Sequence, residues 1–234
     1  MHIVLVGDSS TMLATRGGPD VISQVRELLP EGWRASLLAV DGATSAEVPA
    51  QLQRIPPDAS HLVLSAGGND ALMKLDILDT PVDSTSRALT ALAEVSEDFE
   101  DKYRRAVAVC QRLHLPLTLC TIYNGCFPDP TFQRLASTAL MVFNDVILRV
   151  GIESGLRIID LRFVCSSPAD YANPIEPSSI GGAKIARAIV NPVSSPDAHN
   201  SSAKVVAFRP SRVRAACARS PRSRCSMCSS ARAA

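Results

Sequence analysis

Short runs of consecutive apolar residues alternate along the chain with longer segments whose apolar residues recur at helical spacing. The apolar runs cover residues 3–6, 33–40, 61–65, 117–122 and 157–161. Helical spacing covers residues 20–29, 45–54, 84–115 (in one piece or two), 131–154 and 181–189, and residues 163–179 read mostly as loop. Strands that alternate with helices predict βαβ units and a mainly parallel sheet. We therefore expect an α/β protein, a three-layer α/β/α sandwich with a five-stranded sheet.

The alternating pattern stops after Val190. Residues 191–234 are rich in Ser, Ala, Arg, Pro and Cys, and their eight basic residues against one acid give a net charge of +7. Residues 1–190 hold 16 basic and 22 acidic residues, a net charge of −6. Such a tail cannot bury enough apolar surface to offset its ordering entropy. We expect one domain in residues 1–190 and a disordered basic tail in residues 191–234, unless a reading-frame error produced this segment.

The composition narrows the class of protein. Of the 234 residues, 46% are hydrophobic and 20% charged, and the net charge of +1 indicates no specific nucleic acid and no membrane as a partner. The first residues lack the features of a secretory signal, and we expect no apolar stretch of the ~18 residues that a membrane span needs. Seven cysteines, an odd number, then predict reduced thiols. We expect a cytoplasmic protein.

A glycine pair and the cysteines of the tail do not match the patterns of a cofactor site or a metal site. Gly17-Gly18 lacks the spacing of a dinucleotide-binding loop. The tail cysteines Cys217, Cys225 and Cys228 have no nearby histidine to complete a zinc site. We therefore expect no cofactor and no metal.

The candidate chemistry lies in the turns that follow three of the expected strands. Gly7-Asp8-Ser9 follows the first strand, residues 41–44 (Asp-Gly-Ala-Thr) the second, and residues 67–70 (Gly-Gly-Asn-Asp) the third. Open α/β sheets carry their chemistry at this carboxyl edge. A serine hydroxyl placed there can attack a carbonyl when a base removes its proton and donors stabilise the oxyanion.

Three groups in these turns are suitable oxyanion donors: the backbone N–H of Ser9, the backbone N–H of Gly42 and the side-chain amide of Asn69. Ester hydrolysis passes through a tetrahedral oxyanion, which such donors meet at ~2.7–3.1 Å. Glycine at position 42 allows a close backbone approach, and asparagine donates without titrating.

With these blocks in this order, residues 1–190 resemble the SGNH/GDSL hydrolase superfamily, whose sandwich is flavodoxin-like. The resemblance implies Ser9 as the nucleophile, Ser9, Gly42 and Asn69 in the oxyanion hole, and supporting positions at Asp8, Gly68 and Asp70. It also implies a substrate class, a small-molecule carboxylic ester such as an O-acylated small molecule or sugar.

The family's fourth block, Asp-x-x-His before a small-residue helix, is altered in this chain. Residues 170–177 read DYANPIEP, and the helix that follows contains Gly-x-Ala-Lys-Ile-Ala. Matching that helix places Glu176 at the histidine position and Asn173 at the aspartate position. A glutamate ordinarily titrates near ~4.3, although burial can raise its pKa by several units. Glu176 is therefore the expected replacement base, and Asp170 is a second carboxylate that could orient a water or the substrate.

The four histidines do not replace that base by their positions in the chain. His2 and His61 begin strands at the opposite edge, His114 precedes a strand, and His199 lies in the tail. Two functional hypotheses remain open: an ester hydrolase with an atypical base, and a non-catalytic acyl- or carbohydrate-binding protein on the same fold. In either case, the loops at residues 73–83 and 127–131 are expected to line the pocket.

Overall fold

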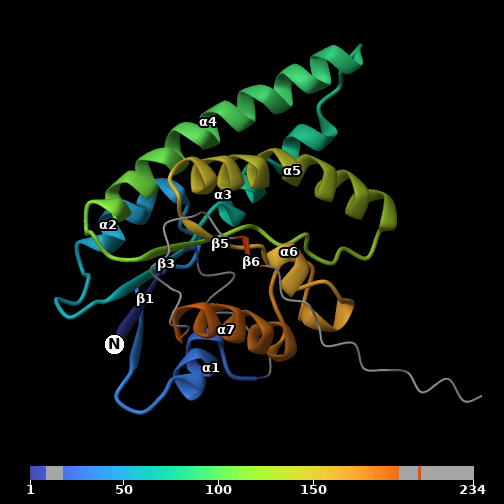
Figure 1. Ribbon diagram of the computed structural model, residues 1–234. Helices are drawn as coiled ribbons and strands as arrows, with labels where there is room; N and C mark the ends of the chain where they lie inside the picture. Colours follow the sequence, from blue (N-terminus) through green and yellow to red (C-terminus); the bar gives the residue numbers. More distant parts are fainter. Residues whose placement is uncertain (9–17, 195–204, 207–234) are drawn as a thin grey trace, which may run out of the picture.

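A parallel β-sheet forms the centre of the computed structural model, which describes residues 1–8, 18–194 and 205–206 (Figure 1). Its strands lie in the order β2-β1-β3-β4-β5-β6, and every neighbouring pair is parallel. The strands are β1 (His2–Gly7), β2 (Arg34–Leu37), β3 (His61–Ser65), β4 (Leu117–Cys120), β5 (Arg157–Ile159) and β6 (Val205–Val206). The expected α/β fold and its five parallel strands are confirmed, and β6 is an additional strand.

Regular structure extends beyond Val190, the end of the expected domain. Helix α7 (Ser179–Ser194) continues four residues past Val190. Val205–Val206, in the segment expected to be disordered, pair with Ile158 and Ile159 as β6. Two β-branched residues suit a strand, and their pairing covers an edge that β5 would otherwise leave open. The rest of the tail lies outside the described residues.

Helices cover both faces of the sheet, as Figure 1 shows. Helices α1 (Val21–Leu28) and α7 lie on one face, and α2 (Val48–Leu52), α4 (Thr85–Gln111) and α5 (Pro130–Glu153) lie on the other. Along β1, Ile3 and Leu5 pack with the first group of helices, whereas Val4 and Val6 pack with the second. A strand buried on both faces explains the continuous apolar run at the start of the sequence.

Polar caps define where the long helices begin. Asp20 accepts a hydrogen bond from the N–H of Ser23 at the start of α1, and Ser84 caps α4 through the N–H of Arg87. The helical segment expected over residues 84–115, in one piece or two, is one helix over Thr85–Gln111. The helix expected over residues 45–54 begins with a 3₁₀ turn, η1 (Ser45–Glu47), and continues as α2. Short helical turns also occur where no helix was expected: α3 (Gly68–Leu72), η2 (Leu75–Asp79), α6 (Leu161–Val164) and η3 (Pro168–Asp170).

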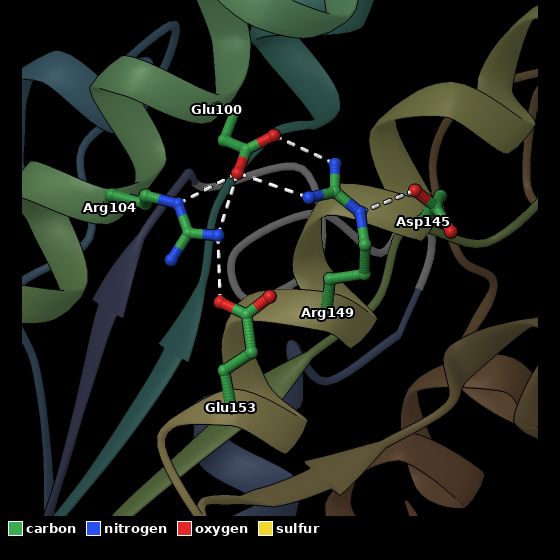
Figure 2. A network of polar contacts seen from close by, with 5 residues as sticks. All are labelled: Glu100, Arg104, Asp145, Arg149 and Glu153. Carbon is green, nitrogen blue, oxygen red and sulfur yellow. Dashed lines mark hydrogen bonds and ion pairs between the residues drawn. The ribbon is translucent and has the colours of Figure 1, made fainter.

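An ion-pair network joins α4 to α5 (Figure 2). Glu100 on α4 accepts hydrogen bonds from Arg149 on α5, at 2.7 and 3.1 Å, and from Arg104 on its own helix at 2.7 Å. Arg104 also contacts Glu153, and Arg149 contacts Asp145. The Arg149 and Arg104 hydrogen bonds lower the pKa of Glu100 below its usual range. The network fixes two helices that also line the cavity described below.

The expectation that no stretch is long and apolar enough to span a membrane is wrong for helix α5. Its 24 residues have a mean hydropathy of 1.5 in an 18-residue window, which satisfies that test by length and composition. Phe143, Val146, Ile147 and Val150 are nevertheless buried against the sheet. A helix that packs in the core of a protein meets the same criterion.

Candidate active site

Side-chain hydrogen bonds tie together the turns that follow β1, β2 and β3. Oδ2 of Asp8, a residue only 2% exposed, accepts a hydrogen bond from the N–H of Gly68 at 2.9 Å. The side-chain amide of Asn69 donates to the carbonyl of Ala43 at 2.8 Å. The first and second turns are thus each joined to the third. Ser9, which directly follows Asp8, lies outside the described residues.

Gly7 ends β1 in a conformation that excludes other residues. Its φ is +120°, and a Cβ at this position would lie 1.8 Å from the carbonyl oxygen of Ser65. The buried side chain of Gln51, on α2, pairs with both backbone groups of Gly7, each at 2.8 Å. The polypeptide therefore enters the Asp8 turn from a fixed point. Sequence reasoning missed Gln51 because no local pattern marks a contact across 44 residues.

The two proposed oxyanion donors in the described part of the chain occupy different settings. Gly42 adopts a φ of +72°, and apart from its chain neighbours no heavy atom of the described residues lies within 4 Å of where its Cβ would be. Among these residues, nothing crowds that side of Gly42. Asn69 carries two N–H donors on its amide nitrogen, and one of them reaches Ala43.

Asp70 braces the β2 turn from the β3 side. Its carboxylate accepts hydrogen bonds from the N–H and the hydroxyl of Ser45, both at 2.8 Å. Burial raises the pKa of Asp70 above its usual value, although the two hydrogen bonds from Ser45 act in the opposite direction. These contacts account for Asp70 as a supporting residue.

The structure brings Asn173 and Glu176 into direct contact. The side-chain oxygen of Asn173 accepts hydrogen bonds from the N–H groups of Ile175 and Glu176, at 3.0 and 2.9 Å, and its amide nitrogen donates to Oε2 of Glu176. The loop is anchored to the segment after β4, because the Tyr123 hydroxyl donates to the Ile175 carbonyl at 2.7 Å. A neutral amide thus orients the Glu176 carboxylate.

Asp170 holds the loop to helix α7. Its fully buried carboxylate accepts hydrogen bonds from the N–H groups of Ser166 and Ser167, at 3.0 and 2.9 Å. The ammonium of Lys184 lies 2.6 and 2.8 Å from its two oxygens. At Gly181, a Cβ would lie 2.1 Å from the Asp170 carbonyl. These contacts engage the carboxylate in folding, so the structure does not group Asp170 with the three turns.

His2 belongs to a separate polar cluster at the amino edge of the sheet. Its ring nitrogens lie 2.7 Å from the hydroxyl of Ser36 and 3.1 Å from the carboxylate of Asp58. Asp58 also pairs with Arg34. This cluster clamps β1, β2 and the segment before β3 at the edge opposite Gly7. In the part of the chain that the structure describes, no three His, Cys, Asp or Glu side chains group as a metal site.

An apolar cavity opens beside the turns that follow β1 and β3. It measures about 870 Å³ with its open mouth included, and its lining includes Asp8, Gly68 and the adjoining Ser65. Both predicted pocket loops contribute, through Leu75, Ile77 and Leu78 of one and Phe127 of the other. Sequence reasoning missed the share of α4 and α5. The cavity is lined further by Leu72, Leu92, Val95, Ile122, Ala136, Ala139, Leu140, Phe143 and Ile175.

Several solved structures share this fold. An extracellular lipase from Streptomyces rimosus is 16% identical, with a TM-score of 0.62 over 81% of this chain and 98% of the lipase. A lipase from a goat rumen metagenome is 19% identical, with a TM-score of 0.63 over 81% of this chain and 95% of that one. An acetylxylan esterase from Geobacillus stearothermophilus, crystallised as a catalytic mutant, is 18% identical, with a TM-score of 0.56 over 81% and 92% of the two chains.

The sequence comparisons identify a family. None of the curated proteins matches this chain significantly. The profile of the GDSL-like lipase/acylhydrolase family matches residues 5–181, which include all three linked turns and the Asn173–Glu176 loop. The chain therefore belongs to the GDSL-like lipase/acylhydrolase family, and by that membership it is an ester hydrolase.

Proposed function

We propose that this protein cleaves a carboxylic ester with Ser9 as the nucleophile and Glu176 as the base. The backbone N–H of Gly42 and the amide of Asn69 stabilise the oxyanion, together with the N–H of Ser9. The observation that carries this proposal is the pair of hydrogen bonds that joins the three strand-end turns, Asp8 to Gly68 and Asn69 to Ala43. A site that is fixed before the substrate arrives stabilises developing charge without reorganisation.

The reaction proceeds by two acyl transfers. Glu176 accepts the proton of the Ser9 hydroxyl, directly or through one water, as the oxygen attacks the ester carbonyl. The tetrahedral intermediate collapses, the ester C–O bond breaks, and the alcohol leaves with the proton from Glu176. Water then attacks the acyl-serine while Glu176 takes one of its protons. The bond between the acyl carbon and the Ser9 oxygen breaks, Glu176 returns the proton to that oxygen, and the carboxylic acid leaves.

Asn173 and Glu176 suit one another as a pair, whereas a glutamate at position 176 would be poorly matched with the family's aspartate at position 173. An aspartate at position 173 would set a second carboxylate against Glu176, and like charges repel. Asparagine instead donates a hydrogen bond to one oxygen of Glu176. The second oxygen remains as the proton acceptor in this mechanism.

The first test is hydrolysis of p-nitrophenyl acetate and butyrate by purified protein. Ser9→Ala abolishes activity above background, whereas Ser10→Ala, a matched control one residue along the chain, retains it. Glu176→Gln keeps the shape of the side chain and removes the base, which lowers kcat by ~10²–10⁴-fold. Equal rates for the wild type and Ser9→Ala would remove Ser9 from the mechanism.

A second test rebuilds the family's pair. The double variant Asn173→Asp/Glu176→His supplies an imidazole with a carboxylate to orient it, and imidazole has a pKa much nearer to neutrality than glutamate. We expect its kcat at pH 7.5 to exceed that of the wild type, and Glu176→His alone to gain less. A double variant slower than Glu176→Gln would contradict the placement of these two residues.

A non-catalytic binding protein is the second candidate function. It is favoured by the hydrogen bond that engages Glu176 with Asn173, because a carboxylate held this way can be purely structural. A fluorophosphonate probe separates the two functions. An activated Ser9 labels rapidly and Ser9→Ala does not, whereas in a binding protein the wild type and the variant label equally slowly.

A further inference from the structure

Two apolar helix faces extend the cavity away from the candidate site. On α5, Ala136, Ala139, Leu140 and Phe143 line the cavity, and their spacing of 3, 1 and 3 residues places them on one face of the helix. On α4, Leu92 and Val95 also line the cavity. Phe143 is the end nearer to the three turns, since its ring packs on Phe99, which lies beside Gly67.

The length of this wall follows from helix geometry. Phe143 lies seven positions after Ala136, and a rise of about 1.5 Å per residue gives ~10 Å. An extended hydrocarbon chain advances by roughly 1.25 Å per carbon, given a C–C bond of about 1.5 Å. The part of the cavity that runs along α5 from Ala136 to Phe143, called the channel below, therefore matches the length of a chain of about eight carbons.

The lining side chains indicate that the channel is built to be filled. Protein interiors pack as densely as organic crystals, so apolar side chains that surround a hollow lose contacts they could otherwise make. Val95 and Leu140 are only half-buried although both pack against the core, and η2, which also lines the cavity, contains no buried residue. An apolar ligand would complete their burial.

Charge restricts what can enter. Only two side chains that are charged at neutral pH line the cavity in the described part of the chain, Asp8 and Lys74. Asp8 is hydrogen-bonded to Gly68 at the end beside the turns, and the exposed Lys74 lies 3.8 Å from Asp98 on α4. The rest of the wall offers mainly methyl, methylene and aromatic groups. A sugar or another polyhydroxylated group would lose more hydrogen bonds to water there than the few polar side chains of the lining can replace.

We infer that this cavity binds the acyl chain of the substrate, and that the preferred ester carries an unbranched chain of about eight carbons. The inference rests on the proposed function for the position of the ester, which lies at the Asp8–Gly68 end. The alcohol part of the ester faces the solvent at the open mouth. Acetate esters fit the reacting centre but leave the channel empty.

Chain-length kinetics test the inference. Specificity constants (kcat/KM) for p-nitrophenyl esters of 2, 4, 6, 8, 10 and 12 carbons rise with chain length by up to about fourfold per methylene, as expected for burial of each group. The rise ends near eight carbons. Constants that are flat or that fall from acetate onwards would overturn the inference.

A bulky substitution tests whether α5 forms the wall. Ala139→Phe lowers the ratio of octanoate to acetate specificity constants at least tenfold. Met141→Phe adds an aromatic ring to the same helix at a side chain that is 61% exposed and does not line the cavity, and it leaves the ratio unchanged. Equal ratios for the two variants would contradict the assignment.

Direct binding distinguishes this inference from the reaction itself. Displacement of a fluorescent fatty acid by octanoate is measured on Ser9→Ala, which requires no turnover. Octanoate binding that Ala139→Phe weakens and Met141→Phe does not supports the channel even if no ester is hydrolysed, in which case only the proposed reaction fails. Absence of octanoate binding in a protein that hydrolyses acetate esters overturns the channel and leaves the reaction standing.

Discussion

The clamp between Gln51 and Gly7 is testable by a substitution of similar volume. Gln51→Met removes the amide and leaves the N–H of Gly7 without its 2.8 Å acceptor. An orphaned buried donor costs about 1–3 kcal/mol. The Gly7 carbonyl loses its 2.8 Å donor but keeps a longer contact with the N–H of Val40 at 3.4 Å, so its cost is smaller. We expect a total loss of about 2–4 kcal/mol in the free energy of unfolding.

Urea denaturation followed by circular dichroism measures this loss, which corresponds to a fall of roughly 4–15 °C in Tm for a chain of this size. Gln51→Glu provides a diagnostic control, because its carboxylate accepts from the Gly7 N–H but donates to the carbonyl only when protonated. Its folded-state pKa is therefore raised, and its stability falls as pH rises through that pKa. A Gln51→Met protein within 0.5 kcal/mol of the wild type would refute the reasoning.

Three further predictions concern stability. Burial raises the pKa of Asp70 above 3.8, so just above pH 3.8 the folded protein holds a proton on Asp70 that the unfolded chain releases. The free energy of unfolding therefore falls as the pH rises through this range. Asp70→Asn removes this pH dependence from urea midpoints measured between pH 3.5 and 6. Lys184→Met leaves the buried Asp170 carboxylate with backbone donors only, and it lowers the free energy of unfolding by about 2–4 kcal/mol; a loss below 1 kcal/mol would show that the pair is dispensable. Gly181→Ala places a methyl group against the Asp170 carbonyl and lowers Tm, whereas alanine at the exposed Arg187, on the same helix, leaves Tm within about 2 °C.

The sequence predicted best what local pattern determines. The bounds of β3, His61–Ser65, follow from an apolar run between a polar start and a glycine-rich turn. The strand at residues 33–40 was predicted too long, because only Arg34–Leu37 form the strand and Val40 adds an isolated bridge to Asp8. Helix α3 was missed because Gly68 and Asn69 favour turns when read one residue at a time.

Tertiary contacts account for most of the remaining misses in the candidate site. The order of the three turns is visible in the chain, but the hydrogen bonds that link them depend on how neighbouring strands align. The Asn173–Glu176 contact spans three residues, and an asparagine that accepts from the backbone two and three residues ahead is a local turn signal that could have suggested it. The cavity depends on the separation of α4 and α5, for which neither helix carries a signal.

The contacts of Gly181 and Lys184 give the small-residue helix of the fourth family block a structural role. Both residues belong to the helix pattern that identifies the fourth family block, and both contact Asp170 for reasons of packing and charge neutralisation. A descendant that had lost all hydrolytic chemistry would still need them in order to fold. This part of the family pattern is therefore explained by folding, and the hydrolytic chemistry belongs to the nucleophile and its proton acceptor.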